Sequence, residues 1–220
     1  MSNLNFLHSG GNKVTLSAPA SNPSSDLTLK LPQADGSAGQ FLKTDGSGAL
    51  SFATPTDTLG LAMADSWRLT ADITSFTNAD ITSNWARNFT TAMSGGYLHA
   101  GAIGSAMTES SGIFSFPSTG VYLIKFFITT NTNNTSNRYL EANIFVTRDN
   151  GSSYQMFSRG FGNSYNSTSS TYFTAVAEAM FDVKNSNHKV KFNSSAGNAV
   201  TVIGGNYNLT YASFLRLGNT

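Results

Sequence analysis

Residues 112–130, GIFSFPSTGVYLIKFFITT, constrain the fold more than any other stretch of the chain. A short apolar segment, 113–116, leads into PSTG at 117–120, where proline presets one backbone dihedral and glycine permits a tight reversal. Residues 121–130 are then almost continuously β-branched or aromatic, and only Lys125 among them is charged. This pattern predicts a short strand, a turn and a long strand buried on both faces.

The same stretch resembles the globular head domain of complement and tumour-necrosis-factor-like proteins, whose central strands carry an F-x-x-P-x-x-G-x-Y-x-[IFV]-x-[FY] pattern. The matching positions here are Phe114, Pro117, Gly120, Tyr122, Ile124 and Phe126. Residues 173–181 and 211–217 resemble the long inner strand and the closing strand of that family, so the resemblance covers about residues 67–217. It implies an all-β, antiparallel jelly-roll sandwich that packs as a trimer and is not an enzyme.

Turn residues divide the predicted head, residues 67–220, into short strands with no long helical period, as an antiparallel sandwich requires. The expected strands are 67–74, 96–100, 112–116, 121–130, 139–148, 154–161, 171–181, 188–193, 200–203 and 209–217. Residues 73–89 are expected to form a loop with room for one helical turn, because Ala79, Ile81 and Trp85 partly follow helical spacing. Residues 56–66 are interpreted as a linker.

Residues 1–55 are predicted to form a small β appendage with too little apolar sequence for a core of its own. Segments 13–17 and 26–31 alternate apolar and polar residues, and two further short strands flank the Asp45-Gly46-Ser47-Gly48 turn as a hairpin. The resulting apolar stripe consists of Val14, Leu16, Leu27, Leu29, Leu31, Phe41, Leu42, Leu50 and Phe52. Because sheets of this size are marginal alone in water, another copy of the chain or a partner is expected to cover the stripe.

The segment TLKLPQADGSAGQFLKTDGSGALSFA, residues 28–53, is similar to a motif of bacteriophage tail-fibre and other virion proteins, where it precedes a C-terminal head. The resemblance implies that residues 1–55 anchor the chain to other virion proteins of the capsid or tail. The start of the chain has neither a basic segment nor an apolar run typical of a signal peptide. A protein made in the host cytoplasm and released in a virion is therefore expected.

Composition excludes several kinds of function. Charged residues make up only 11% of the chain, the net charge is +1, and no run of Lys or Arg is present. A nucleic-acid groove needs clustered cations, so no nucleic-acid partner is expected. There are no cysteines, hence no disulfide or Cys-based site. The apolar runs fall far short of the ~20 residues that cross a bilayer, so no membrane insertion is expected.

The histidines, carboxylates and aromatic residues are the candidates for chemical sites. His8, His99 and His188 lack the paired spacing of metal ligands, and Asp65, Asp72 and Asp80 do not follow a calcium-loop pattern. The glutamates Glu109, Glu141 and Glu178 are the only ones in the chain, and they leave paired-carboxylate hydrolysis open. Five aromatic residues flank a polar loop and suit either strand packing or sugar stacking: Tyr154, Phe157, Phe161, Tyr165 and Tyr172. No catalytic residue, cofactor or metal is predicted.

The sequence thus predicts a non-enzymatic virion structural protein, a trimeric fibre or decoration protein. An adhesin that binds a host receptor or surface glycan is the alternative, and a tailspike glycan hydrolase would need an acidic cleft that the sequence does not indicate. Six apolar side chains exceed what one small sandwich needs and are expected to pack the core or a three-fold seam. They are Phe116, Tyr122, Ile124, Phe126, Phe214 and Leu215.

Overall fold

The computed structural model describes residues 4–17, 19–21, 23–54, 61–88, 102–132, 134–163, 169–205 and 207–220. The chain divides into two compact units, Met1–Thr58 and Leu59–Thr220, here called the N-terminal unit and the head. All named secondary-structure elements in the described residues are β-strands. These residues contain no helix that is long and apolar enough to cross a membrane. The predicted strand 96–100 and residues His99 and Tyr165 lie outside the described residues.

The N-terminal unit contains two antiparallel hairpins, of which only the second was fully predicted. The first pairs β1 (Leu4–Leu7) with β2 (Lys13–Leu16), and the second pairs β3 (Phe41–Thr44) with β4 (Leu50–Ala53). The Asp45 carboxylate accepts the backbone N–H groups of Ser47 at 2.7 Å and Ala49 at 3.0 Å, which fixes the second turn. Residues 26–31 form no strand of their own and pair with the residue before β4 through an isolated parallel bridge between Lys30 and Ala49.

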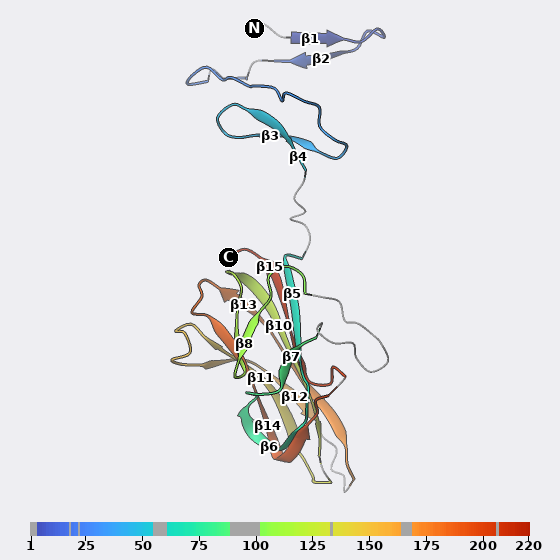
Figure 1. Cartoon of the computed structure of the whole chain (residues 1–220), viewed down its shortest axis with the longest axis vertical. Coiled ribbons are helices and arrows are strands. Elements are labelled where there is room, and N and C mark those ends of the chain that lie inside the picture. The colour runs from blue at the N-terminus through green and yellow to red at the C-terminus, as the bar shows by residue number, and fades with distance from the viewer. Residues whose placement is uncertain are drawn as a thin grey trace. The chain divides into compact units, whose positions relative to one another are not determined.

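The head is an antiparallel jelly-roll sandwich of two sheets whose strands run lengthwise through it (Figure 1). We call sheet I the strands ordered β7-β5-β15-β10-β13, and sheet II the strands β12-β11-β14 with β6 and the β8–β9 hairpin beside β14. Sheet I comprises β5 (Met63–Leu69), β7 (Trp85–Arg87), β10 (Gly120–Asn131), β13 (Tyr172–Val183) and β15 (Tyr211–Gly218). Sheet II comprises β6 (Ile73–Asp80), β8 (Thr108–Ser110), β9 (Ile113–Ser115), β11 (Tyr139–Thr147), β12 (Gln155–Asn163) and β14 (Lys189–Val202).

The two sheets are joined at two places. At one corner β10 also pairs with β14 through Thr130 and Asn131. At the other, β12 lies against β13, where Ser158 Oγ donates to the Glu178 carbonyl at 2.7 Å. A Cβ atom added at Gly160 would lie 1.6 Å from the Val176 carbonyl oxygen, so this close approach of the two backbones requires glycine.

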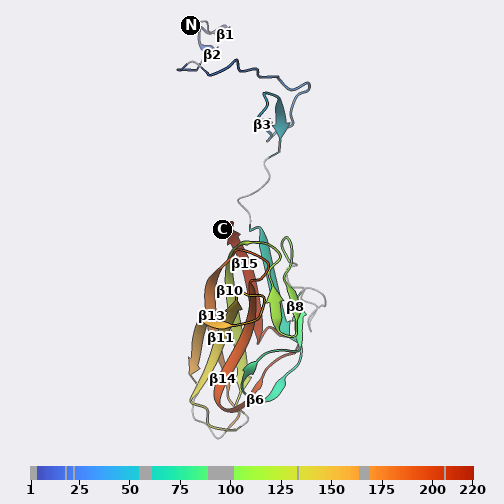
Figure 2. The same ribbon diagram turned by 90° about the vertical axis from the view of Figure 1, so that its left-hand side faces the viewer.

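One aromatic cluster fills the space between the two sheets, whose ribbons Figure 2 shows from the side. Phe114 lies at its centre, with Trp67, Trp85, Phe192 and Phe214 within 5.3–5.5 Å between ring centroids. These rings come from both sheets, so the core ties the layers together. Edge-to-face contacts of this kind add about 0.5–1.5 kcal/mol per pair beyond area burial.

Several sequence-based expectations need correction. Strand β10 is not buried on both faces, because its residues alternate between fully buried and half-buried. The predicted loop 73–89 contains β6 and β7, since pairing with β14 and β5 outweighs the weak helical spacing. The predicted linker 56–66 overlaps β5, which begins at Met63 and pairs with β15. The two strands expected at 188–193 and 200–203 form one long strand, β14.

Candidate functional site

The outward face of sheet I is apolar and lies on the side of the sheet opposite the core. Core residues alternate along β10, β13 and β15 with side chains that point away from the sandwich. These three strands lie side by side with β10 in the middle, so their outward residues form rows across the sheet. We call the following residues the sheet I face: Leu123, Lys125, Phe127, Val176, Glu178, Met180, Tyr211, Ser213 and Leu215.

Two apolar rows of the sheet I face flank one polar row. In the first apolar row Leu123 pairs with Met180 on one side and with Leu215 on the other. In the second, Phe127 lies between Val176 and Tyr211, and its ring stacks on that of Tyr211 with centroids 4.5 Å apart and planes 8° apart. Met180 is 65% and Val176 40% exposed in a single subunit, and the other apolar residues of the two rows are half-buried.

The polar row keeps the sheet I face electrically neutral. Lys125 Nζ lies 2.6 Å from Glu178 Oε2, and the pair sits between the two apolar rows beside Ser213. Burial raises the pKa of the neighbouring Tyr211 hydroxyl, and the nearby Lys125 ammonium opposes that shift. A neutral, apolar, nearly continuous sheet surface is suited to contact with another protein surface.

The six side chains predicted to pack the core or a three-fold seam fall into two groups. Tyr122, Ile124, Phe126 and Phe214 are 0% exposed within one subunit, so they belong to its core and cannot also line a seam. Phe116 packs against that core, with its ring 4.7 Å from that of Tyr122. Of the six, Leu215 alone points outward from sheet I.

Of the two places predicted for these side chains, the core or a seam, the buried four therefore occupy the core. The residues that do face outward lie at the alternate positions of the same strands. They are Leu123, Phe127, Val176, Met180 and Tyr211. Alternation within the apolar run 121–130 was the sequence signal that could have separated the two sets.

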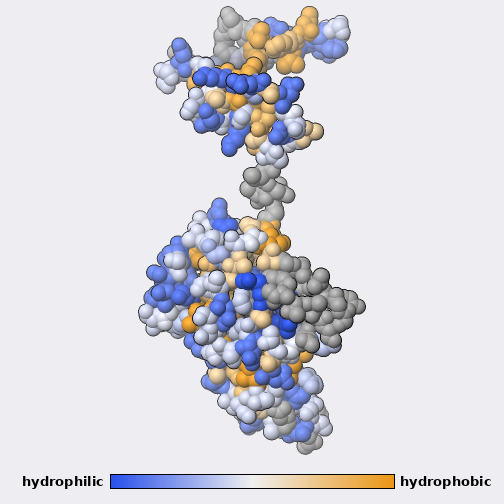
Figure 3. Space-filling model, viewed as in Figure 1, coloured by the Kyte–Doolittle hydropathy of each residue, from blue (hydrophilic) through white to orange (hydrophobic). Residues whose placement is uncertain are grey.

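The N-terminal unit carries the second uncovered apolar surface (Figure 3). Every residue of its predicted stripe is exposed or half-buried, and no residue of the described part of this unit is buried. Exposures of the larger side chains are 67% for Val14, 61% for Leu16, 74% for Leu27, 67% for Leu29, 77% for Leu31, 47% for Phe41, 49% for Leu42 and 41% for Phe52. Leu50 is half-buried.

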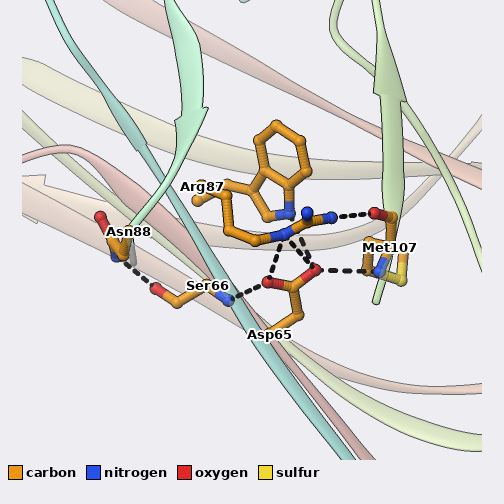
Figure 4. A network of polar contacts seen from close by, with 6 residues as sticks. Asp65, Ser66, Arg87, Asn88 and Met107 are labelled. Carbon is orange, nitrogen blue, oxygen red and sulfur yellow. Dashed lines mark hydrogen bonds and ion pairs between the residues drawn. The ribbon is translucent and has the colours of Figure 1, made fainter. Parts of the chain in front are cut away.

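The buried carboxylate of Asp65 lies in a network of polar contacts within the head (Figure 4). The Asp65 side chain is 0% exposed and accepts hydrogen bonds from the Met107 backbone N–H at 2.9 Å, the Trp67 indole at 3.1 Å and Arg87 Nε at 3.2 Å. Arg87 also donates to the Met107 carbonyl and lies over the Trp67 ring at 4.7 Å. The carboxylate thus joins β5, β7 and the segment before β8, with its acceptor sites occupied by protein donors.

The other candidate chemical groups lie in separate places. Glu109 accepts the Gly112 backbone N–H, Glu141 pairs with Arg159, and Glu178 pairs with Lys125. The residues described contain no group of three or more His, Asp or Glu placed to hold a metal ion. His188 is buried against Phe181.

The aromatic residues near the polar loop divide into two kinds. Tyr154 lies under the Lys191 ammonium at 4.3 Å, and Phe157 packs against Phe181 at 5.3 Å. Phe161 and Tyr172 remain 63% and 64% exposed, and the Arg159 guanidinium lies 5.8 Å from the Phe161 ring. The first pair packs within the head, whereas the second pair is available to a partner.

No family model matches the chain, and no curated protein matches it. Solved structures do match. The Eiger TNF of S. frugiperda is 11% identical, with a TM-score of 0.51 over 73% of this chain and 96% of that one. Murine APRIL is 10% identical, with a TM-score of 0.47 over 70% of this chain and 98% of that one.

The head has a tumour-necrosis-factor-like jelly-roll fold. At this level of identity the likeness concerns the fold. The predicted fold class, an all-β antiparallel jelly roll, is confirmed.

Proposed function

We propose that this chain is a non-enzymatic structural protein of a bacteriophage virion, a trimeric fibre or decoration protein. Residues 1–55 attach it to the capsid or tail, and the jelly-roll head is displayed. The observation that carries the proposal is the sheet I face, a partly exposed apolar surface whose Lys125–Glu178 ion pair is formed within one subunit. The phage setting rests on the resemblance of residues 28–53 to virion proteins.

The electrical neutrality of the sheet I face supports contact between copies of the head. Because Lys125 and Glu178 pair within one subunit, identical faces approach without like-charge repulsion. Contact between copies then removes the exposed Met180 and the half-buried Leu123 and Leu215 side chains from water, which contributes about 25 cal/mol per Å² of apolar area buried. Closed symmetry limits such contacts to a defined number of subunits.

The topology of the head supports display of its loops. The chain enters at Met63 and ends near Arg216, which is the register partner of Met63, so both lie at one end of the head. Strand β10 runs to Asn131 at the opposite end. There Asn137 Nδ2 donates to the Asn198 carbonyl at 3.1 Å, and Asn198 N–H donates back to Asn137 Oδ1 at 3.0 Å. This reciprocal pair ties the polar loop between β10 and β11 to strand β14.

The first test is the oligomeric state of a charged variant. We expect Met180→Asp to convert the trimer to a folded monomer, because trimer formation would bury an unpaired carboxylate. The control is Phe161→Asp, which places the same charge at a position of equal exposure, 63% against 65%, outside the sheet I face. Light scattering of purified protein measures both. A monomeric parent protein, or equal effects of the two variants, would refute the trimer.

The second test is incorporation into particles. Deletion of residues 1–55 is expected to leave a folded head that no longer enters particles, read by gel or cryo-microscopy. A shortened head that still decorates particles would place the anchor in the jelly roll and reverse the assigned roles.

A host-receptor or glycan-binding adhesin is the alternative, and the exposed rings of Phe161 and Tyr172 favour it. If it holds, replacing both rings with alanine abolishes binding to host cells while leaving incorporation intact.

A further inference from the structure

The N-terminal unit has regular hydrogen bonding without a core. In the first hairpin Leu4 lies opposite Leu16, and Phe6 lies opposite Val14, so the apolar side chains gather on one face. All four are 56–67% exposed. Two-stranded hairpins are at best marginally stable in water, and three or more strands with a covered apolar face are needed for independent stability. Something outside this chain's own N-terminal unit must therefore cover that face.

Residues 26–31 carry the same pattern on an extended segment. Leu27, Leu29 and Leu31 alternate with polar residues and are 67–77% exposed. The segment is held beside β4 by two backbone hydrogen bonds, from Lys30 N–H to the Gly48 carbonyl and from Leu50 N–H to the Lys30 carbonyl, both 2.8 Å.

Gly48 makes this arrangement possible. Its φ is +96°, and a Cβ atom there would lie 2.3 Å from the Thr28 carbonyl oxygen. The local backbone is thus built to hold an apolar extended segment in place. Its three leucines still lack an apolar partner within the described unit.

Charge favours identical copies as that partner. Residues 1–54 contain three lysines, at 13, 30 and 43, and three aspartates, at 26, 35 and 45, so their net charge is zero. Identical neutral surfaces with alternating leucines meet without net repulsion. The head also holds copies of the unit close together if it is trimeric, which raises their effective concentration.

We propose that residues 4–54 fold as a three-chain β unit, in which the stripe residues Val14, Leu16, Leu27, Leu29 and Leu31 of each copy pack against those of two other copies. This inference rests on the proposed trimer. The attachment site for the virion is then the assembled three-chain unit, and not a stripe on a single chain.

Cysteine cross-linking in the full-length protein tests the inference directly, because the chain has no cysteine of its own. We expect Leu29→Cys to form covalent dimers on mild oxidation, seen on a denaturing gel, with a yield that does not change on tenfold dilution. The matched control, Thr28→Cys, places the thiol on the opposite side of the same extended segment. It is expected to give several-fold less cross-linking.

A second pair of cysteine variants controls for local structural disruption caused by the first pair. Leu16→Cys and Thr15→Cys repeat the comparison on β2, where Thr15 Oγ1 donates to Asn5 Oδ1 at 2.7 Å on the polar face. Agreement between the two pairs would support a shared inter-chain core. Equal yields for the apolar and polar positions in both pairs would overturn it, because chance collisions do not distinguish the two faces.

Light scattering of the same samples separates this inference from the proposed function. If the protein is a trimer but neither Leu29→Cys nor Leu16→Cys forms cross-links, the proposed trimeric head stands and the three-chain unit is refuted. A monomer refutes the trimeric head and the inference together. Cross-links formed in particles only to a different protein would show that this partner covers the stripe, and would also overturn the inference.

Discussion

Phe52 of the N-terminal unit and Phe126 of the head both lie on paired antiparallel strands, yet Phe52 is 41% exposed and Phe126 is fully buried. Both units follow the same strand alternation. In the head, a second sheet covers the apolar face of the first. In the N-terminal unit, no described residue of that unit does so. An apolar strand pattern therefore specifies a strand, but the number of layers decides whether a single chain can stabilise it.

The largest expected effect comes from matched phenylalanine substitutions in the two units. Phe126→Ala leaves a cavity in a closed core and should lower the free energy of unfolding by about 3–5 kcal/mol. Phe52→Ala should leave head unfolding within about 0.5 kcal/mol of the parent. Both tryptophans, Trp67 and Trp85, belong to the head, so tryptophan fluorescence during urea unfolding reports the head specifically. Equal losses would mean that the two units share one core.

A pair of aspartate substitutions compares buried and exposed polar networks. Asp65→Asn removes the charge opposite Arg87, whose side chain is 28% exposed, and should destabilise the head by about 2–3 kcal/mol. Asp45→Asn weakens an exposed turn of the N-terminal unit and should leave the same fluorescence transition unchanged. If Asp65→Asn were silent, the network of Figure 4 would contribute nothing to joining β5 and β7.

A glycine substitution tests how the head closes its edge. Gly160→Ala forces β12 away from the Val176 carbonyl and should cost about 1–3 kcal/mol of stability. Gly218→Ala, where an added Cβ meets nothing within 4 Å, is the control and should be neutral. Chemical denaturation measures both. A neutral Gly160→Ala would show that β12 does not depend on this close approach.

The smallest effect concerns an exposed turn of the head, where hydrogen bonds alone provide order, as they do in the N-terminal hairpins. Hydrogen bonds from the Ser153 and Thr147 side chains lower the pKa of Asp149 from 3.8 to about 2. Because the folded pKa lies below the unfolded one, this contribution is present above pH 4 and is lost as the pH falls towards about 2. Ser153→Ala should raise the pKa towards 3.8, measured by NMR titration of the carboxyl carbon. An unchanged pKa would assign the shift to the Thr147 hydroxyl and the Ser153 backbone N–H, which the substitution leaves in place.

Local patterns were sufficient to predict β10, β13 and the hairpin at residues 40–53, because alternation and turn residues are properties of short segments. They were insufficient for β6 and β7, whose strand conformation depends on pairing with β14 and β5. The outward residues Leu123 and Met180 were missed for a similar reason. Only the register of β10 and β13 shows that they form one row.

Hydrogen exchange on the full-length parent and on Met180→Asp tests the contrast between the two units most directly. Backbone amides of β10 and β14 should be protected in both proteins, since the head core lies within one chain. Amides of β3 and β4 should be protected in the parent and should exchange rapidly in the variant, because separate chains leave their hairpin uncovered. Equal protection of β3 and β4 in the trimer and in the monomer would contradict the claim that this unit obtains its core from other copies.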